Sequence, residues 1–306
     1  MTAAFRVRKA GLLTTIQDLG RPHAIASGVT PGGAMDRFAH GAANLLVGND
    51  RGAATLECTV RGPVVVAERS CQVAITGGDL EPRVNGVAAP MWTSIELSAG
   101  DELAMGSRRS GARAYVAVGG GIVADRWLGS TSTNLLVGRG GMHGRALRDG
   151  DVIDVGSQTD PPPSGRELAE GLRPAYADHA LHAVRGPYPT PAIFASVYRL
   201  SPDSNRMGYR LDGPRVEGGG EEILSFVMVA GAVQVPSGGS PILLMADHQT
   251  AGGYPVAAVV AGASMPVAAQ LAPGDELTFV ETSMEYALAM RAAQRVALES
   301  LTIWSM

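Results

Sequence analysis

The chain has 306 residues, about twice the ~150 of a typical domain, so two domains are expected. With 45% hydrophobic and 18% charged residues it is too apolar for a disordered protein. The net charge of −4, with no basic stripe, argues against a nucleic-acid partner.

Targeting signals and several chemistries are also excluded. No apolar run reaches the ~18 residues of a membrane span, and no signal peptide is recognisable, so we expect a cytoplasmic protein. Lys9 is the only lysine and lacks the glycine loop of a Walker A motif. Cys58 and Cys71 could form one disulfide, but two cysteines are too few for a disulfide framework, and two buried free thiols are the favoured interpretation.

Most of the sequence, from its start to its end, predicts β structure. Short runs rich in β-branched residues lie between Gly, Pro or Asp, as in barrels and sandwiches. Examples are Gln72–Thr76, Ala114–Val118, Glu222–Val229 and Ala257–Val260. Helices are expected at Arg37–Leu46, which ends at Gly48-Asn49, and at Ser283–Leu301, which has one apolar face.

The stretch Pro161–Gly165 is stiff and cannot pair centrally in a sheet, so it marks a domain boundary. We expect an N-terminal domain over 1–160, a linker over 161–175, and a C-terminal domain with a terminal helix over 176–306. Three features recur in the same order, 168 to 174 residues apart, which suggests an internal duplication. They are Gly62 and Gly231, Asp79 and Asp247, and Asp101 and Asp275.

Several motifs favour structural interpretations. Gly119–Ala124 fits a dinucleotide-binding pattern, but no helix and acidic residue follow at the required positions, so a turn between strands is expected. His179 and His182 have no further cluster to complete a metal site. The serine elbow of α/β-hydrolases is absent.

The densest polar segment, Asp247–Pro255, follows an apolar strand, so a rigid sheet can aim its side chains. Asp247 beside His248 suits acid–base chemistry, and Gly252-Gly253 lets backbone approach a ligand. A polar hairpin capping a barrel remains an equal alternative.

A second segment, Ser201–Arg210, contains Arg206, whose planar guanidinium can bind a carboxylate or phosphate, although a solvated turn is the commoner interpretation. Structural interpretations are also favoured for Thr14–Pro22 and for Gly28–Asp36, where Asp36 could cap the first helix or bind a partner.

Seven motifs, in order, resemble the family of the allophanate hydrolase second subunit, which includes the KipA-like proteins and the 5-oxoprolinase C-subunit proteins. The resemblance covers roughly residues 5–280, a carboxyltransferase-domain region related to urea amidolyase. The motifs are Gly11–Pro22, Gly33–Asp36, Asn44–Asn49, Ser204–Leu211, Gly231–Pro236, Ala246–Thr250 and Gly253–Pro255. The chain departs from the usual pattern at Thr30–Gly33, Ser237–Gly239 and Ala251.

The resemblance implies two cyclophilin-like β-barrels, in agreement with the predicted β structure and the duplication. It also implies that the chain pairs with a KipI-like first subunit. A lactam-utilisation third subunit joins in the 5-oxoprolinase type, where ATP hydrolysis drives lactam opening.

Our first hypothesis is a hydrolase subunit, inactive alone, that acts on the C–N bond of a lactam or urea-like amide with ATP. His248 would be the acid–base group, held by Asp247 or another acid, and Arg206 would hold the substrate carboxylate or a carboxy-phosphate-like intermediate. The expected substrate-binding residues are Asn205, Gln234, Gln249, Thr250, Gly253 and Tyr254. No nucleotide loop is recognisable, so the ATP site is not located.

Two alternatives remain open. A biotin-dependent carboxyltransferase module would need biotin on a separate carrier, because the chain has no Met-Lys-Met acceptor. A non-catalytic protein could instead bind and antagonise a KipI-like kinase inhibitor, in which case the same pocket residues would be relics without a present role.

Overall fold

A computed structural model describes residues 2–188, 190–216 and 223–302 of the chain. It divides into two compact units. The first unit contains the chain up to Gly20, Asp36–Arg173, and the chain from Arg295 onward; the second contains Arg21–Met35 and Pro174–Gln294.

The first unit contains twelve of the described strands and one α-helix. The strands are β1 (Thr2–Lys9), β2 (Leu13–Gln17), β3 (Thr55–Thr59), β4 (Val64–Ala67), β5 (Cys71–Asp79), β6 (Arg83–Val84), β7 (Val87–Ala88), β8 (Ser94–Leu97), β9 (Glu102–Ala104), β10 (Ser110–Val118), β11 (Ile122–Val123) and β12 (Val152–Val155). The helix is α1 (Arg37–Leu46), and a 3-10 turn covers Glu170–Leu172.

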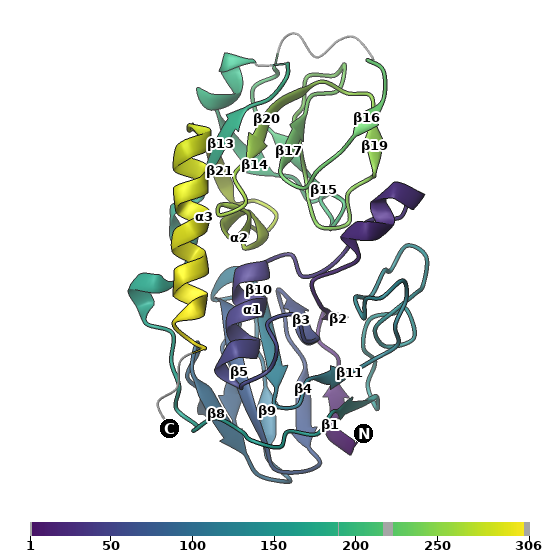
Figure 1. Cartoon of the computed structure of the whole chain (residues 1–306), viewed down its shortest axis with the longest axis vertical. Helices are drawn as coiled ribbons and strands as arrows, with labels where there is room; N and C mark the ends of the chain where they lie inside the picture. The colour runs from purple at the N-terminus through teal and green to yellow at the C-terminus, as the bar shows by residue number, and fades with distance from the viewer. Residues whose placement is uncertain (1, 189, 217–222, 303–306) are drawn as a thin grey trace. The chain divides into compact units, whose positions relative to one another are not determined.

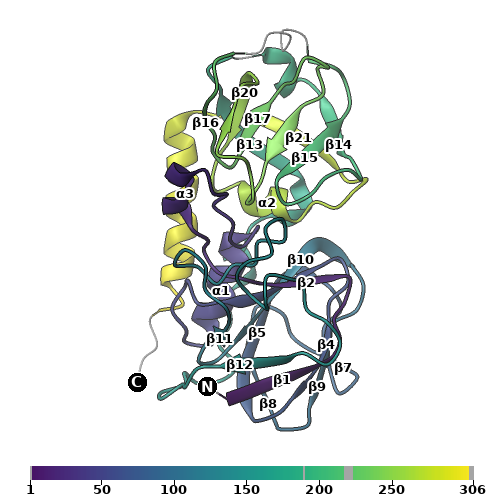
Figure 2. The ribbon, with the colours of Figure 1, turned by 90° about the vertical axis from the view of Figure 1, so that its right-hand side faces the viewer.

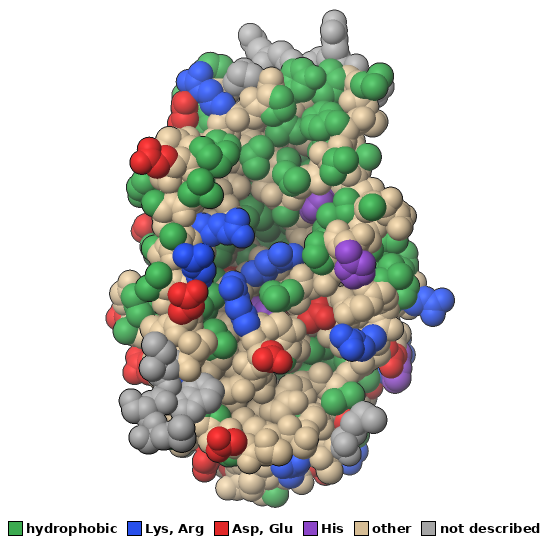
Figure 3. All heavy atoms as spheres, viewed as in Figure 1, with side chains coloured by type: hydrophobic (Ala, Val, Ile, Leu, Met, Phe, Trp, Pro, Cys, Tyr) green, Lys and Arg blue, Asp and Glu red, His purple; other side chains and the backbone are tan. Residues whose placement is uncertain are grey.

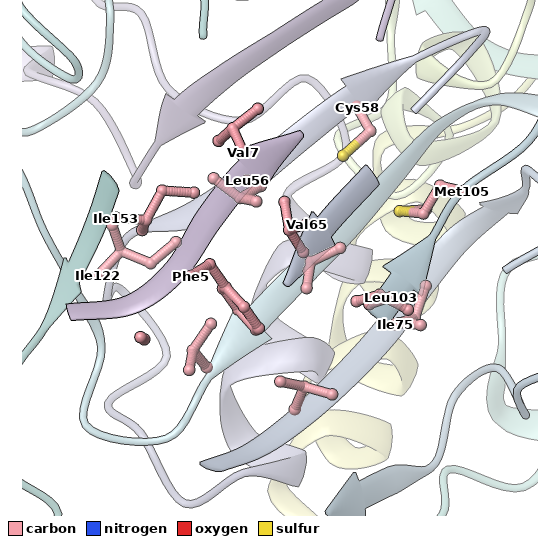
Figure 4. Close-up of a cluster of buried hydrophobic side chains, with 14 of the residues drawn as sticks. Phe5, Val7, Leu56, Cys58, Val65, Ile75, Leu103, Met105, Ile122 and Ile153 are labelled. Carbon is pink, nitrogen blue, oxygen red and sulfur yellow. The ribbon is translucent and has the colours of Figure 1, made fainter. Parts of the chain in front are cut away.

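These strands form two antiparallel sheets in the orders β11-β12-β1-β4-β9-β6-β7 and β2-β3-β10-β5-β8. Phe5 and Val65 from the first sheet meet Leu56 and Ile75 from the second in one buried cluster (Figure 4). Each of these four side chains is at most 1% exposed, and burying such a side chain contributes about 1.5–3 kcal/mol.

The other face of the second sheet is polar and buried. Side chains alternate along a strand, so Leu56 enters the core while Glu57 points the opposite way, toward the face that α1 covers (Figure 1). Tyr115 lies opposite Glu57 in the β3–β10 register. Its hydroxyl donates to Glu57 Oε2 at 2.8 Å and accepts the backbone N–H of Asp36, also at 2.8 Å. Burial raises the pKa of Tyr115 well above its usual value, so it remains a donor.

His40 on α1 makes the stability of the first unit depend on pH. Its Nδ1 lies 2.9 Å from Thr55 Oγ1, and burial lowers the pKa of its imidazole to about 4. In the unfolded chain His40 has its ordinary pKa of 6.5, so between pH 6.5 and about 4 it is protonated in the unfolded chain but neutral in the folded one. The free energy of unfolding is therefore unaffected by this group above pH 6.5, and it falls as the pH drops toward 4, by about 3 kcal/mol in all.

We expect urea denaturation between about pH 7 and about pH 4.5 to show this loss, and His40→Gln to flatten it. His143→Gln, at an exposed imidazole, is the matched control and should keep the wild-type profile. A His40→Gln variant with an unchanged pH profile would contradict the assignment.

The second unit contains the remaining strands: β13 (Ala180–Arg185), β14 (Val197–Leu200), β15 (Gly208–Asp212), β16 (Phe226–Val227), β17 (Ala232–Gln234), β18 (Ile242–Leu244), β19 (Ala251–Gly252), β20 (Val256–Val260) and β21 (Glu276–Glu281). Its helices are α2 (Met265–Ala269) and α3 (Met284–Glu299), whose last turn is assigned to the first unit. Short 3-10 turns cover Pro22–Ser27, Tyr176–Asp178 and Pro191–Phe194.

Seven strands close a barrel in the order β13-β20-β17-β18-β15-β14-β21 (Figure 2). The closing pair, β13 and β21, is parallel, and the other pairs are antiparallel. Side chains fill the interior, where the rings of Tyr198 and Phe279 meet edge to face at 6.0 Å. The two-stranded ribbon of β16 and β19 lies outside this ring of strands.

The mainly β fold with few helices is confirmed. Helix α1 has the expected bounds and is capped by Asp36, whose Oδ1 accepts the N–H groups of Phe38 and Ala39. In the expected run Glu222–Val229 only Phe226–Val227 is a strand, and residue 222 lies outside the described residues. None of the described helices is both long and apolar enough to cross a membrane.

The domain organisation differs in detail from the sequence-based boundaries. The division between Arg173 and Pro174 lies inside the expected linker, but residues 21–35 join the second unit and residues from 295 onward join the first. The duplicated segments also have different neighbours. Strands β17 and β18 pair with each other, whereas β4 and β5 lie in different sheets. The duplication therefore stays a prediction.

Candidate functional site

Strand register in the barrel brings the two predicted polar segments together. In the antiparallel pair β15–β18, Gly208 at the start of β15 lies opposite Leu244 at the end of β18. Arg206 is two residues before the first strand and Asp247 three residues after the second, so both emerge at the same end of the pair. The backbone N–H of Asp247 donates to the carbonyl of Arg206 at 2.8 Å, which fixes the two loops to each other.

Arg206 and Asp247 form a well-shielded, two-point ion pair. Arg206 Nε donates to Asp247 Oδ2 at 2.9 Å, and Nη2 donates to Oδ1 at 3.2 Å. Only 10% and 15% of the two side chains are exposed. Arg206 Nη2 also donates to the carbonyl of Gly33 at 2.6 Å, and Gly32 N–H donates to the Ala246 carbonyl at 3.0 Å. The pair thus fastens the Gly32-Gly33 turn to the barrel.

His248 follows the ion pair and is 2% exposed. Its Nδ1 lies 2.7 Å from the backbone carbonyl of Gln249. A carbonyl oxygen only accepts hydrogen bonds, so Nδ1 must carry the proton. In the neutral ring the lone pair is then on Nε2. This tautomer is the one that a general base requires at Nε2.

The two glutamines expected to bind substrate meet under the β16–β19 ribbon. Gln249 Nε2 donates to Gln234 Oε1 at 2.8 Å, and Gln234 Nε2 lies 3.2 Å from Met228 Sδ. Gln234 is 1% exposed. A Cβ on Gly252 would lie 2.9 Å from Gln234 Nε2, so a larger residue at this position would require the Gln234 amide to move. Both amides are engaged with protein atoms in this arrangement.

The other predicted residues lie at the edges of these clusters. Asn205 is exposed, and its Oδ1 accepts the N–H groups of Met207 and Gly208, so it shapes the turn before β15. The carbonyl of Thr250 accepts Met228 N–H, and that of Gly253 accepts Ile223 N–H. Tyr254 is 39% exposed.

Strand β16 and the residues that flank it carry exposed apolar side chains. Leu224 is 93% exposed, Val227 70% and Val229 51%. On the face in Figure 3, hydrophobic side chains are plentiful over the barrel, where few charged ones lie. The predicted site therefore borders an apolar surface.

The motifs with structural interpretations take structural positions in the fold. Gly120 and Gly121 have positive φ in the turn between β10 and β11. Among the described residues, no group of three or more His, Cys, Asp or Glu is placed to hold a metal ion. Cys58 and Cys71 are free thiols.

Sequence reasoning missed two features. The Gly28–Asp36 motif favours a structural role in the sequence, yet its Gly32-Gly33 turn is held by Arg206 and lies at the candidate site. The buried pair Glu57 and Tyr115 is not evident from any motif, although the alternation Thr55-Leu56-Glu57-Cys58 places a carboxylate on a strand with a buried apolar face.

Comparisons with known proteins agree with these motifs. Residues 27–281 match the family described as "Carboxyltransferase domain, subdomain A and B". The chain is 39% identical to the C subunit of the 5-oxoprolinase of Escherichia coli K12, over 97% of both chains. It is 31% identical to the urea amidolyase of Saccharomyces cerevisiae, over 97% of this chain but 18% of that protein.

A solved structure supports the same relationship. The K. lactis urea amidolyase superposes with a TM-score of 0.91 at 28% identity, covering 99% of this chain and 20% of the larger one. The region shared with urea amidolyases is thus about a fifth of those longer chains. The family model matches most of the chain, and the similarity to a 5-oxoprolinase C subunit extends over nearly the full length of both chains. The chain therefore belongs to the carboxyltransferase-domain family, subdomains A and B.

Proposed function

We propose that this chain is a subunit of an ATP-dependent amidohydrolase that opens a lactam or urea-like amide, with 5-oxoproline as the first substrate to test. The observation that carries the proposal is the 39% identity to a 5-oxoprolinase C subunit across 97% of both chains. The chain is inactive alone and pairs with a KipI-like first subunit; a lactam-utilisation protein is the third.

The site geometry supports acid–base chemistry on an amide. Opening a lactam adds water across its C–N bond, so a proton must leave the attacking water and another must reach the departing nitrogen. His248, with Nδ1 held by the Gln249 carbonyl, presents Nε2 for one of these transfers. Arg206 and Asp247 provide a fixed positive and negative group next to it in the chain.

ATP would be hydrolysed in the assembled complex, at a site that we do not place on this chain. Its role would be to activate the amide oxygen or a carboxylate for attack, a task that needs anion-binding groups near the reacting carbonyl. The basic residue of the described site is Arg206, which Asp247 already neutralises.

The test is reconstitution. The tagged chain is produced with the KipI-like and lactam-utilisation proteins of its own source, and glutamate and ADP are measured with 5-oxoproline and ATP. We expect turnover that requires this chain, ATP and the partners together. A complete complex that opens neither 5-oxoproline nor a urea-like amide, or a chain recovered from its host without partners, would overturn the proposal.

A second candidate is a biotin-dependent carboxyltransferase module. The matching family is described as a carboxyltransferase domain, and one region of a urea amidolyase has the fold of this entire chain. Lys9, the only lysine, lies in strand β1 of the first unit, so biotin would arrive on a separate carrier. A biotinylated protein in a streptavidin blot of co-purified material, with carboxyl transfer from it, would favour this candidate.

A further inference from the structure

The turn that Arg206 fastens to the barrel lies in a buried segment and carries two backbone donors for which the described residues supply no acceptor. Pro31, Gly32, Gly33 and Ala34 are all buried. Gly32 N–H donates to the Ala246 carbonyl, whereas within the described part of the chain the N–H groups of Gly33 and Ala34 meet no acceptor. More than about 90% of buried backbone N–H groups are paired, so two adjacent exceptions require an explanation.

The backbone of this turn is reserved for glycine. Gly32 has φ +64° and Gly33 has φ +96°. A Cβ on Gly32 would lie 2.9 Å from Arg21 Nη1, so a larger residue would displace a buried guanidinium as well as strain the turn. Turns of this kind direct successive N–H groups into a concave site for anions.

Arg206 strengthens one of these donors through the peptide bond. The described chain has no cis peptide bonds, so the Ala34 N–H points opposite to the Gly33 carbonyl of the same peptide. Arg206 Nη2 donates to that carbonyl at 2.6 Å. A cation at the carbonyl end polarises the amide, which makes its N–H a better donor on the other side. Asp247 keeps the guanidinium in this position.

We propose that the N–H groups of Gly33 and Ala34 bind an oxygen of the substrate, either an amide carbonyl or a carboxylate. Arg206 is then a positioning residue that acts through the Gly33–Ala34 peptide rather than a direct ligand of the substrate. That the oxygen belongs to a lactam rests on the proposed function; that the turn binds an oxyanion does not. Removing one such donor typically costs about 10²–10³ in turnover.

Nuclear magnetic resonance can observe this peptide directly. Labelling glycine with carbonyl ¹³C and alanine with ¹⁵N restricts the spectrum to Gly-Ala pairs, which include Gly33-Ala34 and Gly111-Ala112. Ala34→Ser removes one signal and so identifies it. The probes are 5-oxoproline and bicarbonate, titrated against sodium chloride at equal ionic strength.

We expect the Ala34 signal to move downfield and saturate with either probe, while Gly111-Ala112 stays still. Arg206→Lys should shift the Ala34 signal upfield and weaken probe binding at least about tenfold. An Ala34 signal that does not move, or that moves with every other pair, would overturn the proposal. So would an Arg206→Lys variant that leaves the Ala34 signal unchanged.

Turnover separates this inference from the proposed function. Ala34→Pro removes the N–H, and the complex carrying it should lose at least about 10² in kcat, while Gly238→Ala, at an open site, keeps wild-type turnover. Full turnover in a folded Ala34→Pro complex would remove the oxyanion site and leave the proposed function intact. Conversely, saturable bicarbonate binding at Ala34 in a complex that opens no lactam would keep the site and reject that function.

Discussion

Arg206→Ala is expected to lower the free energy of unfolding of the second unit by about 3–5 kcal/mol. The substitution leaves the Asp247 carboxylate, 15% exposed, without the guanidinium that binds both of its oxygens. It also removes the donor to the Gly33 carbonyl. An uncompensated buried charge costs much more than the net contribution of the ion pair, so most of the loss comes from Asp247.

Equilibrium urea denaturation, with the barrel amides followed by hydrogen exchange, measures this loss. The matched control is the double variant Arg206→Met with Asp247→Leu, which removes both charges and keeps most of the volume. We expect it to recover the larger part of the stability while leaving the Gly32-Gly33 turn unfastened. A single Arg206→Ala variant within about 1 kcal/mol of wild type would show that water reaches Asp247 and that the pair is not shielded.

The same pair shows how far the sequence predicts the site. Asp247–Pro255 and Ser201–Arg210 are recognisable in the sequence as polar segments, but no pattern within either segment predicts that the two meet. Their contact is a consequence of the Gly208–Leu244 register in the barrel. Pairing between strands that lie far apart in the chain has no local signature, which is why pattern reasoning cannot place Arg206 against Asp247.

Local signals are sufficient for other elements. Helix α1 has the bounds that its sequence predicts, since Asp36 caps its first turn and Gly48, with φ +74°, follows its last. Propensity and capping act within a few residues and can be recognised directly. The assignment of residues 21–35 to the second unit cannot be recognised in this way. It depends on long-range contacts such as the hydrogen bond from Gly32 N–H to the Ala246 carbonyl.

Gln234 shows that the position of a residue on a strand does not fix what its side chain contacts. The sequence suggests that it orients a neutral group of the substrate, but in the fold its amide binds Gln249 and Met228 beneath the β16–β19 ribbon. Alternation along β17 puts Val233 inside the barrel and Gln234 outside it. Whether a polar residue on that outer face meets solvent or a covering ribbon depends on residues far along the chain, here the β16–β19 ribbon that brings Gly252 next to the Gln234 amide.

His248→Asn should lower kcat of the reconstituted complex by about 10²–10⁴, with little change in KM. The reason lies in which ring nitrogen the asparagine amide can replace. The side-chain NH₂ of asparagine occupies roughly the position of Nδ1 and can still donate to the Gln249 carbonyl, so the loop keeps its anchor. It offers nothing at the position of Nε2, where the proton transfer would occur.

Steady-state turnover of 5-oxoproline with ATP, compared across three variants, separates chemistry from architecture. His248→Asn keeps the anchor and lacks the base, whereas His248→Ala lacks both, so their turnover should fall alike while only His248→Ala loses thermal stability. His179→Asn is the matched control, because His179 is partly exposed, its Nδ1 also lies near a backbone carbonyl (Glu276, 3.0 Å), and its φ of +49° is a backbone form that asparagine tolerates. If His248→Asn retained full turnover while His248→Ala lost it, the imidazole would be an anchor for the loop and the base would have to lie elsewhere. Because the asparagine amide can replace Nδ1 but not Nε2, this comparison assigns the function of His248 to one nitrogen or the other.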